Sequence, residues 1–259
     1  MMRARFWAST VALVLGVSAS ACTTVEPAVE VGQREFSDPS AFFNSQLNTF
    51  SCATCHQTTG SLDPTRRDPG YDLSGVVARS STWGGKVDRL EDAVSFCLTY
   101  FMRQPESAPL DPTSQESRAL YDYLVSITPA GSPIAVQPMT VVTTIAPIAM
   151  GDAGNGAAIY AAACASCHGD AHTGKGSNIR PVAVILPEYT STCLDGQPAL
   201  GEGCYQVTFP GVAPGLVVIE KIRHGRFFGV GGTMSFYSEE TLSDAEIGDL
   251  LAFLDLPAM

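Results

Sequence analysis

The sequence has few charged residues and fewer basic ones than acidic ones. Charged side chains make up 16% of its 259 residues, and 15 Lys and Arg stand against 26 Asp and Glu, for a formal net charge of −11. A protein that binds nucleic acid presents a basic surface to the phosphates, so this composition argues against such a partner. We expect instead redox or other protein partners that dock through a basic patch of their own.

The sequence also lacks strand-like alternation of apolar and polar residues, and its N-terminal apolar run, residues 6–17, is too short to span a bilayer. The run follows Arg3 and Arg5 and precedes small residues, a pattern typical of a secretory signal peptide over residues 1–21. The stretch Ala19-Ser-Ala-Cys22 resembles a bacterial lipobox. The resemblance implies that Cys22 is lipidated, that residues 22–33 are a tether, and that the chain is an exported lipoprotein on the periplasmic side of a bacterial membrane.

The sequence has eight cysteines, and the seven other than Cys22 sort into groups by their spacing. Export places them in an oxidising compartment, where disulfides form and free thiols are unusual. Two of them lie close together in a Gly/Pro-rich insertion, and we predict that they form a disulfide. Two further pairs have C-x-x-C spacing, and one cysteine has no evident partner. The predicted disulfide joins Cys193 and Cys204. The C-x-x-C pairs are Cys52 with Cys55 and Cys164 with Cys167, and the cysteine without an evident partner is Cys97.

Each C-x-x-C pair is followed directly by a histidine. The two motifs are Cys52-Ala-Thr-Cys55-His56 and Cys164-Ala-Ser-Cys167-His168. This pattern is typical of c-type haem, in which the two thiols attach to the porphyrin and the histidine binds the iron. Half a zinc site would not require a histidine after both pairs. The sequence therefore predicts two covalently bound haem c groups, with His56 and His168 as iron ligands.

The two motifs belong to an internal repeat. Each half is expected to open with a helical segment, over residues 42–50 and 156–163, and to close with a helix that begins at a capping box, Thr113 to Glu116 and Ser243 to Glu246. A segment rich in Pro, Ala, Thr and Val separates the halves. We predict a mostly α fold with two class I cytochrome c-like haem domains in tandem, over residues 34–128 and 151–259, joined by a linker over residues 129–150.

The second half resembles the class I cytochrome c family from about residue 152 to residue 256. The motifs that carry the resemblance are Ile222-Arg-His-Gly225, Gly231-Gly-Thr-Met234 and Leu242-Ser-Asp244. The resemblance implies that Met234 is the sixth iron ligand, although Ser235 follows it where the family usually has proline. His172 and His224 are the remaining candidates for iron, and a role away from the iron is the expected one for both.

Two residues compete for the sixth position in the first half. Met102 is favoured by the repeat register, because it precedes the closing helix as Met234 does. Cys97 is favoured by helical periodicity, which places it near the centre of an apolar stripe. The stripe comprises Leu90, Val94, Cys97, Leu98 and Phe101, and Met102 lies off it if the α-helix continues that far.

Residues 73–134 resemble the haem domain of thiosulfate dehydrogenases and SoxA-type cytochromes. The resemblance rests on Leu90-Glu-Asp-Ala-Val-Ser-Phe-Cys97, Met102, Pro109-Leu110 and Ala119-Leu-Tyr-Asp-Tyr-Leu124. It implies that Cys97 is an axial thiolate opposite His56, in a His/Cys domain that precedes a His/Met domain. Phe96 departs from the polar residue that those enzymes tend to have before the cysteine.

These observations favour an electron carrier or electron-transfer subunit over a stand-alone enzyme. It would pass electrons between periplasmic or membrane-bound redox partners. The alternative is an oxidoreductase of a small sulfur anion, with the first haem and Cys97 as its active site. That chemistry requires cations above the haem, and Arg79, Lys86 and Arg103 are the local candidates.

Overall fold

The computed structural model describes residues 26–40, 49–60, 63, 65–102, 111–131, 135–171, 212–225 and 234–257. Within these ranges every regular element is helical, and the one β pairing is an isolated bridge between Thr82 and Val87. The mostly α prediction is confirmed at this level. None of the helices in the described ranges combines the length and apolarity that a membrane span requires.

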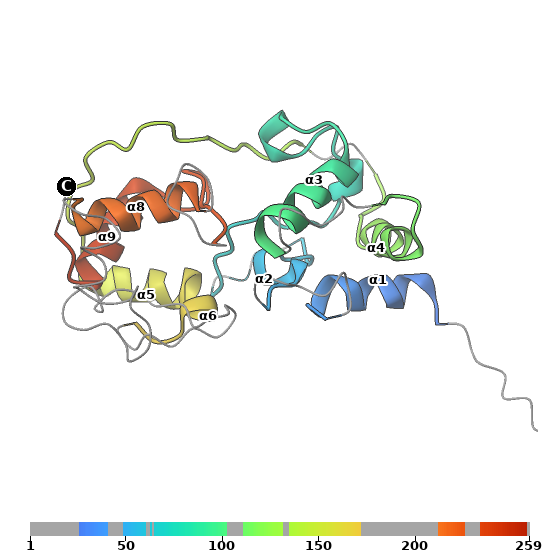
Figure 1. Ribbon diagram of the computed structural model, residues 1–259, viewed down its shortest axis with the longest axis horizontal. Helices are drawn as coiled ribbons and strands as arrows, with labels where there is room; N and C mark the ends of the chain where they lie inside the picture. The colour runs from blue at the N-terminus through green and yellow to red at the C-terminus, as the bar shows by residue number, and fades with distance from the viewer. Residues whose placement is uncertain are drawn as a thin grey trace, which may run out of the picture.

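The helices form two groups joined by an extended segment that runs along one side of the molecule (Figure 1). The first group comprises α1 (Ala28–Ser37), α2 (Cys52–Cys55), η1 (Val76–Ala78), η2 (Trp83–Gly85), α3 (Leu90–Cys97), the π-helix η3 (Leu98–Met102) and α4 (Gln115–Ser126). The second group comprises α5 (Ala153–Ala163), α6 (Ala165–His168), α8 (Pro214–His224) and α9 (Asp244–Phe253).

In the first half, the opening helix α1 packs directly against the closing helix α4. The two backbones meet at Gly32, where a Cβ atom would lie 1.9 Å from the carbonyl oxygen of Ala119. One turn later the ring of Phe36 lies 5.4 Å from that of Tyr123. A residue without a side chain is therefore required at the crossing point.

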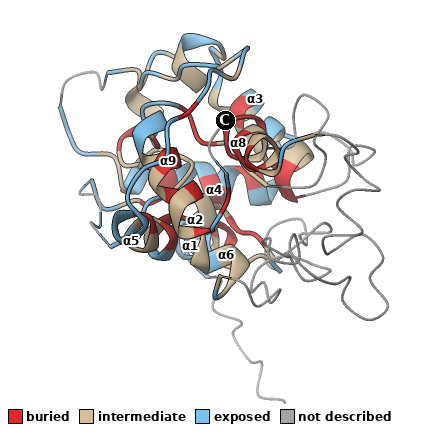
Figure 2. Ribbon diagram, turned by 90° about the vertical axis from the view of Figure 1, so that its left-hand side faces the viewer, coloured by how far each residue is buried: buried red, intermediate tan, exposed pale blue. Residues whose placement is uncertain are grey.

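The second half repeats this crossing with different residues. α5 packs against α9, and a Cβ atom at Gly156 would lie 2.0 Å from the carbonyl oxygen of Asp249. One turn later the ring of Tyr160 lies 5.5 Å from that of Phe253. Figure 2 shows buried positions where the helices of the second group face one another. α5 thus has a glycine and an aromatic residue four positions later, the same pair at the same spacing as in α1.

The start of the first half differs from the sequence-based expectation. A tether was expected over residues 22–33, but α1 begins at Ala28, and Gly32 is buried against α4. The expected opening helix over residues 42–50 falls mostly on residues 41–48, which lie outside the described ranges. The helix that packs on α4 lies earlier in the chain than expected. Residues 38–51 separate α1 from Cys52, whereas α5 leads directly to Cys164.

The closing helices begin close to the predicted capping boxes. At α9 the box is confirmed: the backbone N–H of Ser243 donates to Glu246 Oε2 at 2.8 Å, and the N–H of Glu246 donates to Ser243 Oγ at 3.4 Å. At α4 the prediction is one residue early, since Ser114 caps the helix by accepting from the N–H of Ser117 at 3.1 Å. Thr113 instead donates to Asp111.

The extended segment 135–150 is fastened to both helix groups. Hydrogen bonds with two residues of the first half and two of the second hold it. They join Tyr71 Oη to Pro138 O (2.6 Å), Lys86 Nζ to Met139 O (3.2 Å), Thr140 Oγ1 to Glu240 (2.5 Å) and His224 Nε2 to Val142 O (2.7 Å). We call residues 135–150 the strap. The strap contains no helix, as a segment rich in proline should, and it lies along the surface.

Candidate functional site

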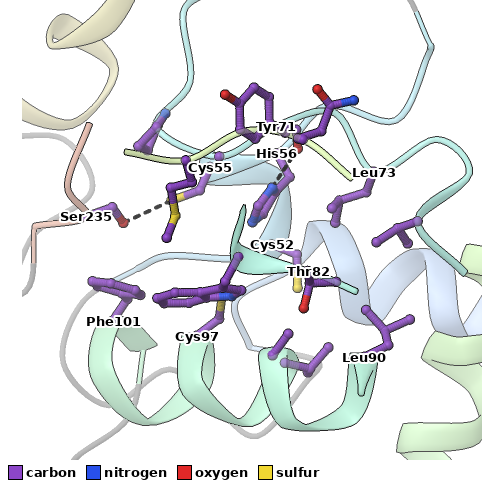
Figure 3. Close-up of a pocket in the computed structure, with 18 of the residues that line it drawn as sticks. Cys52, Cys55, His56, Tyr71, Leu73, Thr82, Leu90, Cys97, Phe101 and Ser235 are labelled. Atoms are coloured by element: carbon purple, nitrogen blue, oxygen red, sulfur yellow. Dashed lines mark hydrogen bonds between the residues drawn. The ribbon is translucent and has the colours of Figure 1, made fainter. Parts of the chain in front are cut away.

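A cavity of about 190 Å³ lies beside the first cysteine–histidine motif (Figure 3). Its upper wall carries Cys52, Cys55 and His56, which follow one another on α2 and at its C-terminal end. Its lower wall is formed by α3 and η3. Most of the lining is apolar, so the cavity suits a largely hydrophobic group.

His56 is oriented by its backbone surroundings. Its Nδ1 atom lies 2.8 Å from the carbonyl oxygen of Tyr71, so the proton is placed on Nδ1 and the lone pair on Nε2. Gly70 permits this arrangement, since a Cβ atom there would lie 2.2 Å from Cε1 of His56. Burial lowers the pKa of His56 and favours the neutral imidazole, the form that binds metal.

The apolar stripe predicted on residues 90–101 faces the cavity. Leu90, Val94 and Phe101 all line it, and Cys97 lies across the cavity from His56 (Figure 3). Burial raises the pKa of the Cys97 thiol, so this sulfur is uncharged unless a cation binds it.

Met102 also reaches the cavity, contrary to the expectation from an unbroken α-helix. The α-helix α3 ends at Cys97, and Leu98–Met102 form a π-helical turn. A π turn contains more residues than an α turn, so it rotates the residues after Cys97 relative to the stripe. Met102 is therefore buried, at 5% exposed, and lines the same wall as Cys97.

Part of the cavity wall comes from residues that sequence reasoning did not connect with it. Gln137 and Met139 come from the strap, and Ser235 and Phe236 come from the second half. Trp83, from η2, completes this side. No local pattern could have identified the first four, because they lie far along the chain from the motif that they enclose.

Two of the three candidate cations near the first site donate hydrogen bonds to backbone carbonyl oxygens. Arg79 lines the cavity, and its Nη2 donates to the carbonyl oxygen of Asp72 at 2.6 Å. Its Nε atom is buried and has no hydrogen-bond partner among the described residues. Lys86 Nζ donates to Met139 O at 3.2 Å. Arg103 lies outside the described residues.

The second motif lies at the end of α5 and on α6. Cys164 and Met234 both pack against the core of the second half. Burial raises the pKa of Cys164 to about 12, and burial, aided by the charge of Lys221, lowers the pKa of His168 to about 4. The Nδ1 atom of His168 is buried and without a hydrogen-bond partner in the described part of the chain. This site therefore combines a neutral histidine with a protonated Cys164 thiol.

Several predicted residues cannot be placed. Cys22, His172, Cys193 and Cys204 lie outside the described residues, so the lipidation and the disulfide stay predictions. His224 is described, and both of its ring nitrogens have partners: Nδ1 contacts the carboxylate of Glu220, and Nε2 contacts Val142 O. His224 therefore fastens the strap.

The residues present fit a haem c group in both halves. At the first site, the Nε2 of His56 is left for a metal, two thiols lie beside the cavity, and Gly70 leaves space for the imidazole. At the second site, the thiols and His168 recur in the same order, Nδ1 of His168 is buried, and the lowered pKa of His168 keeps its imidazole neutral. The cysteines in the described ranges, those of the two motifs and Cys97, form no disulfide.

Comparison with solved structures found nine matching chains. Among them is the thiosulfate dehydrogenase TsdBA from Marichromatium purpuratum in its as-isolated form, with 18% sequence identity and a TM-score of 0.41. The match covers 91% of this chain and 48% of the other, so this chain spans about half the length of that protein. The comparison with curated proteins gave no match.

Comparison with protein families matched residues 151–254 to the family described as cytochrome C oxidase, cbb3-type, subunit III. The matched segment contains the second motif, α8, Met234 and α9. Domains of this type bind haem c, take part in electron transfer and are typically exported. Residues 151–254 of this chain are a cytochrome c domain.

Proposed function

We propose that this chain is an exported c-type cytochrome with two haem groups that transfers electrons between redox partners. The observation that carries the proposal is the first site. There a complete C-x-x-C-H motif borders an apolar cavity, and its histidine is oriented with Nε2 available for a metal. Because residues 151–254 already form one cytochrome c domain, the first site would add a second haem to the same chain.

Each half supplies the same set of functional groups. Cys52 and Cys55 would hold the first haem and His56 would bind its iron; Cys164, Cys167 and His168 would do so for the second. When bound, the iron supplies a one-electron couple. The chain attaches the group, excludes water from it with apolar walls, and selects its potential through the sixth ligand.

We assign Cys97 as the sixth ligand of the first haem, with Met102 as the alternative, and Met234 as that of the second. Cys97 lies across the cavity from His56 (Figure 3), and the cost of deprotonating its buried thiol would be offset by the bond to iron. Met102 lines the same wall. A thiolate stabilises ferric iron, whereas a thioether favours ferrous iron, so the two halves would differ in potential.

A second candidate function is the oxidation of a small sulfur anion such as thiosulfate at the first site. Arg79 favours it, because this cation lines the cavity and its buried Nε has no partner among the described residues. Its Nη2 is held by a backbone carbonyl, which suits a fixed anion site as well as a structural role. An electron carrier remains the first choice.

The proposed location follows from the N-terminal sequence. We propose that Cys22 is lipidated and holds the chain at the periplasmic side of a bacterial membrane. The net charge of −11 suits partners with a basic docking patch. A membrane anchor would raise the concentration of the chain near membrane-bound redox partners.

The proposal is tested on the purified, mature protein. Intact-mass measurement and the alkaline pyridine spectrum should give two covalent haem groups per chain, and electron paramagnetic resonance should give one thiolate-ligated and one thioether-ligated haem. One haem or none would overturn the proposal. Addition of thiosulfate then separates the two functions, because rapid haem reduction without another donor indicates the oxidoreductase and no reduction indicates the carrier.

A further inference from the structure

The residues that follow Met234 belong to the second half but contact the first. The hydroxyl of Ser235 lies 3.5 Å from Sγ of Cys55 and points toward it (Figure 3). The ring of Phe236 lies 6.1 Å from that of Trp83, at an interplanar angle of 55°. Both Ser235 and Phe236 line the first cavity. The backbone that presents Met234 is therefore also a wall of the first site.

The other side of the same segment is fastened to the second half. The N–H of Tyr237 donates to Ile222 O at 2.7 Å, and its hydroxyl donates to Ala163 O at 2.7 Å. Gly225, with φ of +57°, leaves room for the segment, since a Cβ atom there would lie 2.4 Å from the carbonyl oxygen of Met234. Met234 is thus presented by a short stretch of backbone that both halves hold.

Trp83, the first-half partner in this contact, has a strained backbone. Its φ is +51°, a conformation that bulky residues rarely adopt. The paired backbone of Thr82 and Val87 maintains it, with hydrogen bonds of 2.7 and 3.2 Å. Such a conformation persists where the surroundings impose it, most often at functional sites. Here it places the indole against Phe236.

We propose that Trp83 and Ser235 are positioning residues for the second haem: they dock the segment of Met234 on the first half and so hold its sulfur in place. This inference rests on the proposed two-haem function. Attachment of haem would convert Cys55 into a thioether, which can only accept, so the hydroxyl of Ser235 would then be the donor. The segment would couple the sites in both directions, because a coupling free energy is reciprocal.

The first test replaces the aromatic ring in the first half and observes the second haem. In the full haem-loaded protein, Trp83→Leu should weaken the thioether-to-iron charge-transfer band of Met234. It should also increase the affinity of added imidazole for the second iron about two- to tenfold, the range expected for loss of one aromatic pair. Trp83→Phe keeps a ring and should largely restore both properties.

Phe96→Leu is the matched control. Phe96 lies at a similar ring distance from Trp83, 6.0 Å, but it is 40% exposed and does not line the cavity. It should leave the second haem unchanged. An unchanged second haem in Trp83→Leu, or an equal effect of Phe96→Leu, would overturn the proposal.

A smaller substitution covers the case in which Trp83→Leu does not fold. Ser235→Ala should give the same changes at lower amplitude. Its control is Ser166→Ala, which removes a hydroxyl 3.9 Å from Cys167 within the second half. The haem count of the wild type separates the proposed function from the positioning role. Two haems, with a second haem that these substitutions leave unchanged, would refute only the positioning role. Fewer than two haems would refute the proposed function.

Discussion

The two halves cross their first and last helices in the same way but enclose their cysteine–histidine motifs differently. Gly32 and Gly156 make equivalent contacts, each followed by an aromatic residue that meets a ring on the closing helix. The first cavity, by contrast, takes part of its wall from the strap and from the second half. The helix packing of each half therefore uses residues of that half, whereas the first site is completed by residues of the strap and of the second half.

The largest expected effect comes from removing the attachment cysteines of either half. Replacing Cys52 and Cys55 together by Ala should remove one haem from the mass of the mature protein, and replacing Cys164 and Cys167 should remove the other. The remaining haem in each variant should give the spectrum of its own half. If either pair can be replaced without loss of the mass of one haem, that half does not attach haem. The two halves would then not both be haem domains.

The helix crossings can be compared by adding one carbon atom to each. Gly32→Ala and Gly156→Ala should each lower the free energy of unfolding by about 1–3 kcal/mol or more, because the new Cβ would overlap a backbone carbonyl. Denaturant unfolding followed by helical circular dichroism measures this. Gly154→Ala is the control, since its Cβ would meet only the carboxylate of Asp152 at 3.1 Å. Similar stability of all three variants would contradict the crossing.

This repeat also marks the limit of what the sequence could predict. The closing helices were found because a capping box and an apolar run are both local signals. α1 was missed because it contains a glycine and exposes most of its residues, and only the contact with α4 makes it part of the core. Tertiary contacts decided the assignment, and a single sequence does not report them.

The first site was predicted only in part, for two physical reasons. The stripe on α3 was correct because helical periodicity holds up to Cys97. Met102 entered the cavity because the backbone changes to a π turn at Leu98, which periodicity does not reveal. Met139 and Phe236 have no local signal at all. Ligation by Cys97, Met102 and Met234 stays a prediction.

Replacing the sulfur residues of η3 and α3 asks whether the two haems differ in their sixth ligand. Cys97→Ala should remove the thiolate signal in electron paramagnetic resonance and raise the potential of the first haem. Axial ligands shift haem potentials over a range of about 0.8 V in all. Met102→Leu should change neither property. The reverse result would assign Met102 and make the two halves alike.

The smallest expected effect is the dependence of stability on the ionisation of Glu35. This residue follows Gly32 by three positions, as Ile159 follows Gly156 in the second half. Glu35 is 3% exposed, and burial, followed by the charge of Glu116, raises its pKa to about 7. The folded state therefore binds a proton more tightly than the unfolded state. Stability should be greatest below about pH 4.5 for this group, and should fall by at most about 3 kcal/mol as the pH rises through 7.

Glu35→Gln should abolish this dependence and stabilise the protein at pH 8. Unfolding free energies at pH 5 and pH 8 measure it, with Glu30→Gln, an exposed position on the same helix, as the control. Equal slopes with pH in the wild type and Glu35→Gln would show that the buried carboxyl is not the cause.

The contact of Ser235 with Cys55 also fixes an order of events during biosynthesis. The two residues are 180 positions apart, and a ribosome adds roughly 5–20 residues per second, so roughly ten seconds or more separate their synthesis. Until then the first cavity lacks one wall. The motif that is translated first is thus enclosed only after residues 235 and 236 have been made, and in the proposed two-haem protein its thiols would stay open to haem attachment until then.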